Sequence, residues 1–288
     1  MIIFGSIKSG LYRSLKSWKA ILVIWLAFLV IIAGLVLPLR NSLNSAFGSS
    51  MISENLADGF DIMAFTDLGP VLRSLTSYLT GGFVFICITA FVINAFLTGG
   101  LFHSIGKREG GFLSSEFFSA SAKHFWSFLI ISILITLFII FLTGFLILID
   151  VIVAGVSGSL AEKSIFLIMI ITVLVLIFLL PVLLLVADYS RAWKVINGNS
   201  SAFRALRFGF SETFKRFRKS YLLMFIILLI QTLFGYLVLS VIPLWKPRSS
   251  AGLFIFFLVS QGFFILRLFI KSWRYASVTT FMEQNRVE

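Results

Sequence analysis

Residues 164–187 read SIFLIMIITVLVLIFLLPVLLLVA, a run of 24 residues without a charged side chain. A helix needs about 20 predominantly apolar residues to cross the hydrocarbon core of a bilayer. Lipid offers the backbone no hydrogen-bond partners, so a continuous apolar run crosses it as a helix, whose backbone groups bond to one another. The stretch therefore predicts a transmembrane helix.

Five more uncharged runs of comparable length occupy residues 20–39, 74–106, 124–149, 220–245 and 249–266. The mean hydropathy of +1.05 and the 59% of hydrophobic residues exclude a soluble domain, for which roughly 45–50% is usual. The sequence predicts an all-α, polytopic transmembrane six-helix bundle that forms a single domain over residues 1–288. We expect its spans at about 20–39, 81–102, 125–149, 165–187, 221–244 and 251–270.

The positive charges between these runs lie mainly on one side of the expected membrane. The two terminal segments and the second and fourth loops hold nineteen Lys and Arg against six Asp and Glu, whereas the other three loops hold five against six. Lys and Arg near span ends are retained in the cytoplasm. We therefore expect a multi-pass protein of a bacterial inner membrane with both termini cytoplasmic. The expected partners of the basic side are anionic lipids rather than nucleic acid.

Residues 200–221, SSAFRALRFGFSETFKRFRKSY, precede the fifth run and have two faces. Aromatic and aliphatic residues recur every three or four positions, which places them on one side of a helix. This pattern predicts a helix lying in the membrane interface, although an amphipathic helix packed on protein fits it too. The residues expected to contact lipid headgroups are Arg204, Arg207, Lys215, Arg216, Arg218 and Lys219.

Similar amphipathic segments precede the first and third runs. Phe118-Ser119 and Lys123 in one segment match Phe210-Ser211 and Lys215 in another, at equal spacing. The chain can therefore be divided into three units of surface helix, outward span and return span, at roughly 1–101, 102–187 and 188–288. The match covers few positions, so both a true repeat and chance similarity remain open.

Two features of the chain are shared with a known group of membrane proteins. One is the basic segment 210–219 ahead of an odd-numbered span, and the other is residues 96–100 leading into Glu116-Phe117-Phe118. In these features the chain resembles uncharacterised bacterial six-span inner-membrane proteins, and distantly the membrane domain of glycerophosphodiester phosphodiesterases. The resemblance implies a six-span fold. Those phosphodiesterases carry their active site in a separate soluble domain, so the resemblance transfers no catalytic residue.

Residues that carry chemistry are sparse. His103 and His124 lie at the expected inner boundary outside any HExxH frame, and we interpret them as part of amphipathic helices. The single Cys87 lies inside a span. We therefore predict no catalytic residue, no metal site and no cofactor.

The polar residues expected near mid-membrane are three amides, Asn94, Gln231 and Gln261. Lipid cannot pair with an amide, so we expect Asn94 and at least one glutamine to point into the bundle. Such amides hydrogen-bond between helices or line a polar pocket.

The sequence favours a non-enzymatic integral membrane protein that binds lipid or another membrane protein, as a scaffold, assembly factor or passive permease component. A secondary transporter with a polar mid-membrane pocket is the alternative. A lipid-modifying enzyme using Asp58 and Asp61, in the long loop after the first span, is a weaker one.

Overall fold

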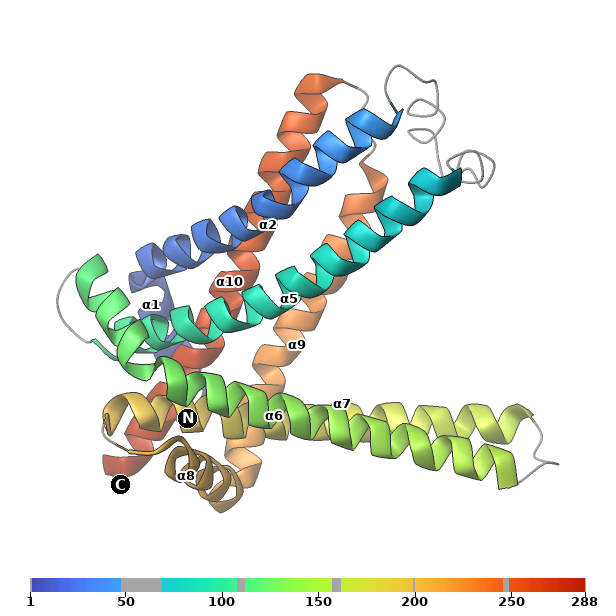
Figure 1. Ribbon diagram of the computed structural model, residues 1–288. Helices are drawn as coiled ribbons and strands as arrows, with labels where there is room; N and C mark the ends of the chain where they lie inside the picture. Colours follow the sequence, from blue (N-terminus) through green and yellow to red (C-terminus); the bar gives the residue numbers. More distant parts are fainter. Residues whose placement is uncertain are drawn as a thin grey trace. The chain divides into compact units, whose positions relative to one another are not determined.

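A computed structural model describes residues 2–47, 69–107, 112–156, 162–198, 200–245 and 249–287. Within these ranges the chain forms helices and no strand. The elements are α1 (Ile2–Lys16), α2 (Trp18–Phe47), α5 (Gly69–Gly106), α6 (Ser114–Val156), α7 (Glu162–Ile196), α8 (Ala202–Lys215), α9 (Phe217–Val241), the short 3-10 helix η1 (Ile242–Leu244) and α10 (Ser250–Val287). Figure 1 shows their order along the chain.

Six of the described helices are long and apolar enough to cross a membrane, which confirms the all-α polytopic prediction. Their apolar segments are Trp18–Pro38, Thr80–Gly106, Ser114–Val153, Phe166–Ile196, Phe217–Leu244 and Ser250–Asn285. Several helices continue past the spans predicted from charge, because a charged side chain need not interrupt the helical backbone. The 43 residues of α6 correspond to about 65 Å, roughly twice the thickness of a hydrocarbon core.

The chain divides into two compact units, which we describe separately. Unit 1 comprises Met1–Leu22 and Ala95–Glu288, and unit 2 comprises Val23–Asn94. In unit 2, α2 and the first part of α5 lie beside each other and enclose an apolar groove of about 560 Å³, lined at its centre by Gly34, Gly81 and Phe85. The single transmembrane domain predicted over residues 1–288 stays a prediction.

The buried core of unit 1 lies at one end, where α1, α8 and the last turns of α10 are located; we call this the basic end. Large side chains from five helices are fully buried there: Phe102, Phe117, Phe128, Tyr189, Leu223 and Phe281. A second group of buried residues joins α6, α7 and α8 through Ile131, Val186 and Ala205. By contrast, residues in the distant halves of the long helices, such as Phe141 and Leu239, are exposed. Protein packing therefore organises the basic end, and the distant halves present an apolar surface suited to lipid.

Three close helix contacts in unit 1 have the same character. In α1, Gly10 lies against Ser277 of α10, and in α8, Gly209 lies against Ser190 of α7. In the third contact, the backbone N–H of Gly100 in α5 donates to Ser121 Oγ in α6 over 3.1 Å. Each contact joins the end of an even-numbered span to one of the three amphipathic segments. The second span contacts the second segment, the fourth span contacts the third segment, and the sixth span contacts the first segment. The contacts follow the order of the three units proposed from the sequence, and the repeat itself stays a prediction.

Gly10 and Gly209 are required because the neighbouring helix lies too close for a side chain at either position. A Cβ atom at Gly10 would lie 2.6 Å from the Ser277 backbone, and one at Gly209 would lie 2.5 Å from the Val186 carbonyl oxygen. Small residues at helix contacts let two backbones approach closely, a common device in membrane proteins.

Candidate functional site

The segment predicted to lie in the membrane interface forms a helix, α8, that is shorter than residues 200–221. It begins after Ser201, whose side chain accepts a hydrogen bond from the Arg204 backbone N–H, and it ends at Lys215. Arg216, with φ −129° and ψ 41°, separates it from α9. The expectation of one continuous helix through Tyr221 is therefore wrong, because the non-helical backbone at Arg216 lets α8 and the following span take different directions.

The surface of α8 has three faces rather than two. Phe203, Phe210 and Phe214 are exposed, with 68% of Phe203 accessible. A face of small residues, including Ala205 and Gly209, packs instead on α7. The helix thus rests on protein through its small residues and keeps its aromatic side free. The sequence signal for this contact is the spacing of Ala202, Ala205, Gly209 and Thr213, which the pattern of large side chains does not reveal.

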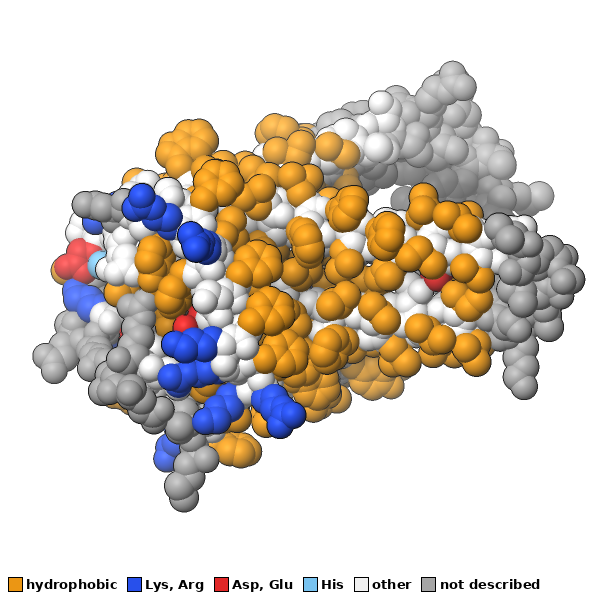
Figure 2. Space-filling view, turned by 90° about the horizontal axis from the view of Figure 1, so that it is seen from below, with side chains coloured by type: hydrophobic (Ala, Val, Ile, Leu, Met, Phe, Trp, Pro, Cys, Tyr) orange, Lys and Arg blue, Asp and Glu red, His pale blue; other side chains and the backbone are white. Residues whose placement is uncertain are grey.

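Five of the six predicted headgroup contacts are exposed: Arg204, Arg207, Lys215, Arg218 and Lys219. Figure 2 shows Lys and Arg side chains gathered at one end of the face in view, with hydrophobic side chains covering much of the rest. Arg216 differs, because its guanidinium is half-buried and donates to the side chain and the backbone oxygen of Asn285 in α10. We therefore assign Arg216 to helix packing rather than to the exposed basic face.

The N-terminal helix α1 follows the same plan. Its buried side carries Ser6, Gly10 and Ser14, and Ser6 Oγ donates to Gln284 Oε1 over 2.7 Å. Tyr12 is exposed on the opposite side. The helix ends at Lys16, and α2 begins at Trp18.

The three predicted amides occupy separate surroundings. Gln231 lines a groove of about 560 Å³ between α9 and α10, together with Thr232, Ser260 and Arg267. Its Oε1 atom is buried and has no hydrogen-bond partner among the described residues. Asn94 and Gln261 are half-buried, and each makes an interaction. Gln231 therefore faces a groove beside its neighbouring helix, and the expectation that Asn94 and at least one glutamine point into the bundle stays a prediction.

A buried ion pair lies at the basic end. Asp188 in α7 is fully buried, and its Oδ2 accepts a hydrogen bond from Arg274 Nε in α10 over 2.9 Å. Arg191 Nη1 lies 3.4 Å from Asp188 Oδ1 and Nη2 donates to Ser132 Oγ in α6. This network ties α6, α7 and α10 together. In the sequence, Asp188 directly follows the uncharged run 164–187. Nothing in the sequence indicates that its partner is Arg274, 86 positions away.

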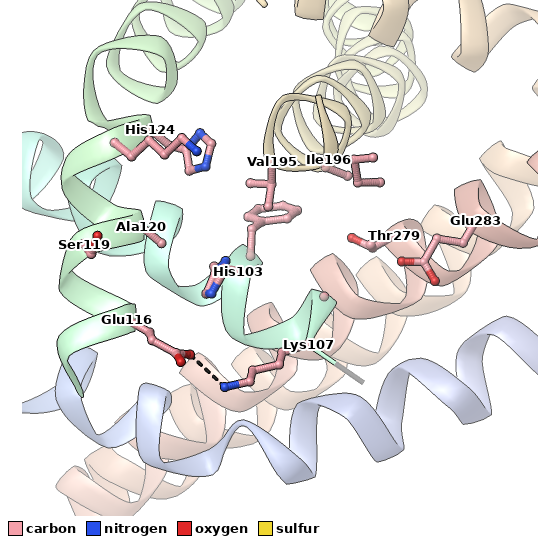
Figure 3. Close-up of a pocket in the computed structure, with 14 residues that line it drawn as sticks. His103, Lys107, Glu116, Ser119, Ala120, His124, Val195, Ile196, Thr279 and Glu283 are labelled. Carbon is pink, nitrogen blue, oxygen red and sulfur yellow. Dashed lines mark hydrogen bonds and ion pairs between the residues drawn. The ribbon is translucent and has the colours of Figure 1, made fainter. Parts of the chain in front are cut away.

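A cavity of about 670 Å³ with both polar and apolar lining residues opens at the same end, between α5, α6, α7 and α10. Figure 3 shows how its labelled residues face one another. Its polar lining comes from His103, Lys107, Glu116, Ser119, Lys123, His124, Thr279 and Glu283. The sequence interpretation of the histidines as ordinary amphipathic residues missed this cavity, because the four contributing segments are distant in the chain.

Both carboxylates of the cavity are already engaged. Lys107 Nζ lies 2.7 Å from Glu116 Oε2, and Arg13 Nη2 of α1 lies 2.8 Å from Glu283 Oε2. Thr279 donates its hydroxyl proton to the Tyr275 carbonyl in its own helix. The lining therefore offers cations and imidazoles rather than free carboxylates.

Within the described residues, no group of three or more His, Cys, Asp or Glu side chains is arranged to hold a metal ion. Asp58 and Asp61, considered for an enzyme, lie outside the described residues. Cys87 is exposed.

No family model, curated protein or solved structure matches the chain. The resemblance to the membrane domain of glycerophosphodiester phosphodiesterases therefore stays a prediction. Functional inference consequently rests on the chemistry of the surfaces described above.

Proposed function

We propose that this protein is an integral membrane scaffold that binds anionic lipids through its basic end, which faces the cytoplasm of a bacterial inner membrane. The observation that carries the proposal is α8: its small face is held on α7, its phenylalanines are exposed, and Arg204, Arg207 and Lys215 are exposed as well. An apolar face flanked by cations suits the boundary between acyl chains and anionic headgroups. Another membrane protein can dock on the same scaffold.

A fluorescent label tests this position of α8 in the full chain, purified in nanodiscs with Cys87 replaced by serine. A label at Phe214→Cys should emit at shorter wavelength and be quenched by nitroxide-labelled acyl chains, because the exposed aromatic face enters the membrane boundary. The matched site is Ser211→Cys, which is exposed on the basic side of the same helix. It should respond much less.

Lipid charge provides the second half of this test. Replacing Arg204, Arg207 and Lys215 together by glutamine should reduce the preference for anionic lipid on the order of 100-fold, at about 1 kcal/mol per cation. Added salt should produce a similar loss in the unmodified protein, because it screens exposed charges. Equal labelling at both cysteines, or a lipid preference that ignores charge and salt, would contradict the proposal.

A secondary transporter is the second candidate, and the groove around Gln231 favours it. A groove of about 560 Å³ with a buried, unpartnered amide oxygen falls within the usual size range of small-molecule sites, roughly 300–1,000 Å³. Thr232 and Ser260 add hydroxyl groups to its lining.

The substitution Gln231→Leu separates the two candidates. In a scaffold, it should leave the free energy of unfolding unchanged or raise it by about 1 kcal/mol, because it removes an unsatisfied buried acceptor. The control Gln261→Leu should lower stability, since Gln261 makes an interaction. Unfolding in mixed micelles measures both. A loss of stability in Gln231→Leu comparable to that of the control would show that Gln231 has a bound partner, and would favour the polar pocket.

A further inference from the structure

The cavity at the basic end contains a buried side chain that the proposed scaffold function leaves unexplained. His124 is 3% exposed, and its Nδ1 atom has no hydrogen-bond partner among the described residues. In Figure 3 the imidazole ring is directed into the cavity, across from Val195. Buried polar atoms are nearly always hydrogen-bonded in native proteins. Because His124 lines the cavity, its unpaired buried nitrogen points to a ligand there.

The charges around His124 indicate the sign of that ligand. Lys194, Lys123 and His103 are near enough to act on its imidazole electrostatically. The Lys194 ammonium donates to the carbonyl oxygens of Gly198 and Ser200, which follow α7. Lys123 is exposed on the cavity wall. Glu116 is paired with Lys107 and Glu283 with Arg13. The Lys123 ammonium is therefore the charge on the cavity wall that these two ion pairs do not balance, and an anion would balance it.

The dimensions and position of the cavity narrow the class of anion. A volume of about 670 Å³ exceeds the needs of a single inorganic ion and suits a drug-sized organic group. The cavity also lies among the basic residues at the ends of the apolar helices, where phospholipid headgroups are expected. Lysine ammonium and histidine N–H groups are suitable donors to phosphate oxygens.

We propose that this cavity binds the phosphate of an organic ester, with Lys123 and His124 as its principal contacts. Lys123 supplies the charge, and His124 donates from Nδ1. Ser119, which is exposed on the same wall, adds a hydroxyl donor. The site is separate from the exposed face of α8, so it does not depend on the proposed lipid-surface function. Its ligand is either a phospholipid headgroup or a soluble phosphate ester, because both present the same group.

The test uses the full chain in nanodiscs of zwitterionic lipid, titrated calorimetrically with glycerol 3-phosphate. In parallel, native mass spectrometry measures retention of phosphatidic acid. The variant Lys123→Gln should weaken binding of at least one of these probes by tenfold or more, as expected for loss of a charged hydrogen bond. Lys8→Gln removes the same charge from an exposed position on α1, outside the predicted headgroup contacts, and should leave binding within about twofold of the unmodified protein.

The two probes distinguish the source of the phosphate. Binding of glycerol 3-phosphate that depends on Lys123 supports a soluble ester, whereas Lys123-dependent retention of phosphatidic acid alone supports a lipid headgroup. His124→Gln is a second variant, and it should weaken binding of the same probe, whereas Lys8→Gln should not. Absence of binding by both probes, or equal loss in Lys123→Gln and Lys8→Gln, would overturn the proposal. Neither result would bear on the position of α8 in the membrane.

Discussion

Replacing Asp188 by asparagine is expected to lower the free energy of unfolding by about 3–5 kcal/mol, the usual cost of removing one partner from a buried ion pair. The substitution keeps the size of the side chain but removes its charge. The Arg274 guanidinium, whose side chain is 8% exposed, would remain buried without a counterion, and the new amide N–H groups would face other donors. Unfolding in mixed micelles, followed by circular dichroism, measures the loss.

Asp150→Asn is the matched control. Asp150 is a half-buried carboxylate in α6, and its Oδ1 accepts a hydrogen bond from the Thr172 hydroxyl in α7 over 2.8 Å. An asparagine carbonyl can accept the same bond, so this variant should lose no more than about 1 kcal/mol. In a double-mutant cycle, Arg274→Leu should recover part of the stability lost in Asp188→Asn, because it removes the uncompensated charge. Equal losses in Asp188→Asn and Asp150→Asn would contradict the ion-pair account.

The second large effect is expected for Gly10→Ala. The added methyl group would lie 2.6 Å from Ser277 backbone atoms, so α1 must move away from α10. Overpacking of this kind typically costs about 1–3 kcal/mol. The displacement should also disturb the ion pair between Arg13 and Glu283 that joins the two helices. Thermal unfolding in detergent should show a clear fall in the midpoint temperature.

Gly5→Ala in the same helix separates packing from helix propensity. A Cβ atom at Gly5 meets no atom within 4 Å, and alanine favours the helix by about 1 kcal/mol relative to glycine. Gly5→Ala should therefore be neutral or stabilising. If Gly10→Ala were as stable as Gly5→Ala, the close contact between α1 and α10 would not exist in the protein.

The second amphipathic segment shows where pattern and structure differ. This is the segment ahead of the third uncharged run, residues 114–126. The sequence predicts that it is similar to the other two surface helices, but it forms the first turns of α6 without a break. The segments in α1 and α8 end at Ser17 and Arg216, where the helix is interrupted. Periodicity reports which side chains share a face, whereas a break depends on a few backbone angles fixed by neighbouring helices.

The site was less accessible to sequence reasoning than the fold. The exposed phenylalanines and cations of α8 could be predicted, because they follow from helical periodicity within fourteen residues. The cavity around His124 could not, since its lining comes from four helices spread from Phe102 to Glu283. Sequence alone did not show that Lys107 and Arg13 would engage the two carboxylates of the cavity.

The sequence by itself determined that the chain is helical and crosses a membrane six times. Uncharged runs of about twenty residues cannot satisfy their backbone in lipid except as helices, and this requirement holds whatever the neighbours are. Tertiary structure alone decided which small faces pack, that Asp188 meets Arg274, and that a histidine is buried beside a cavity. These features depend on distances between segments far apart in the chain, which hydrophobic and charge patterns along single helices do not specify.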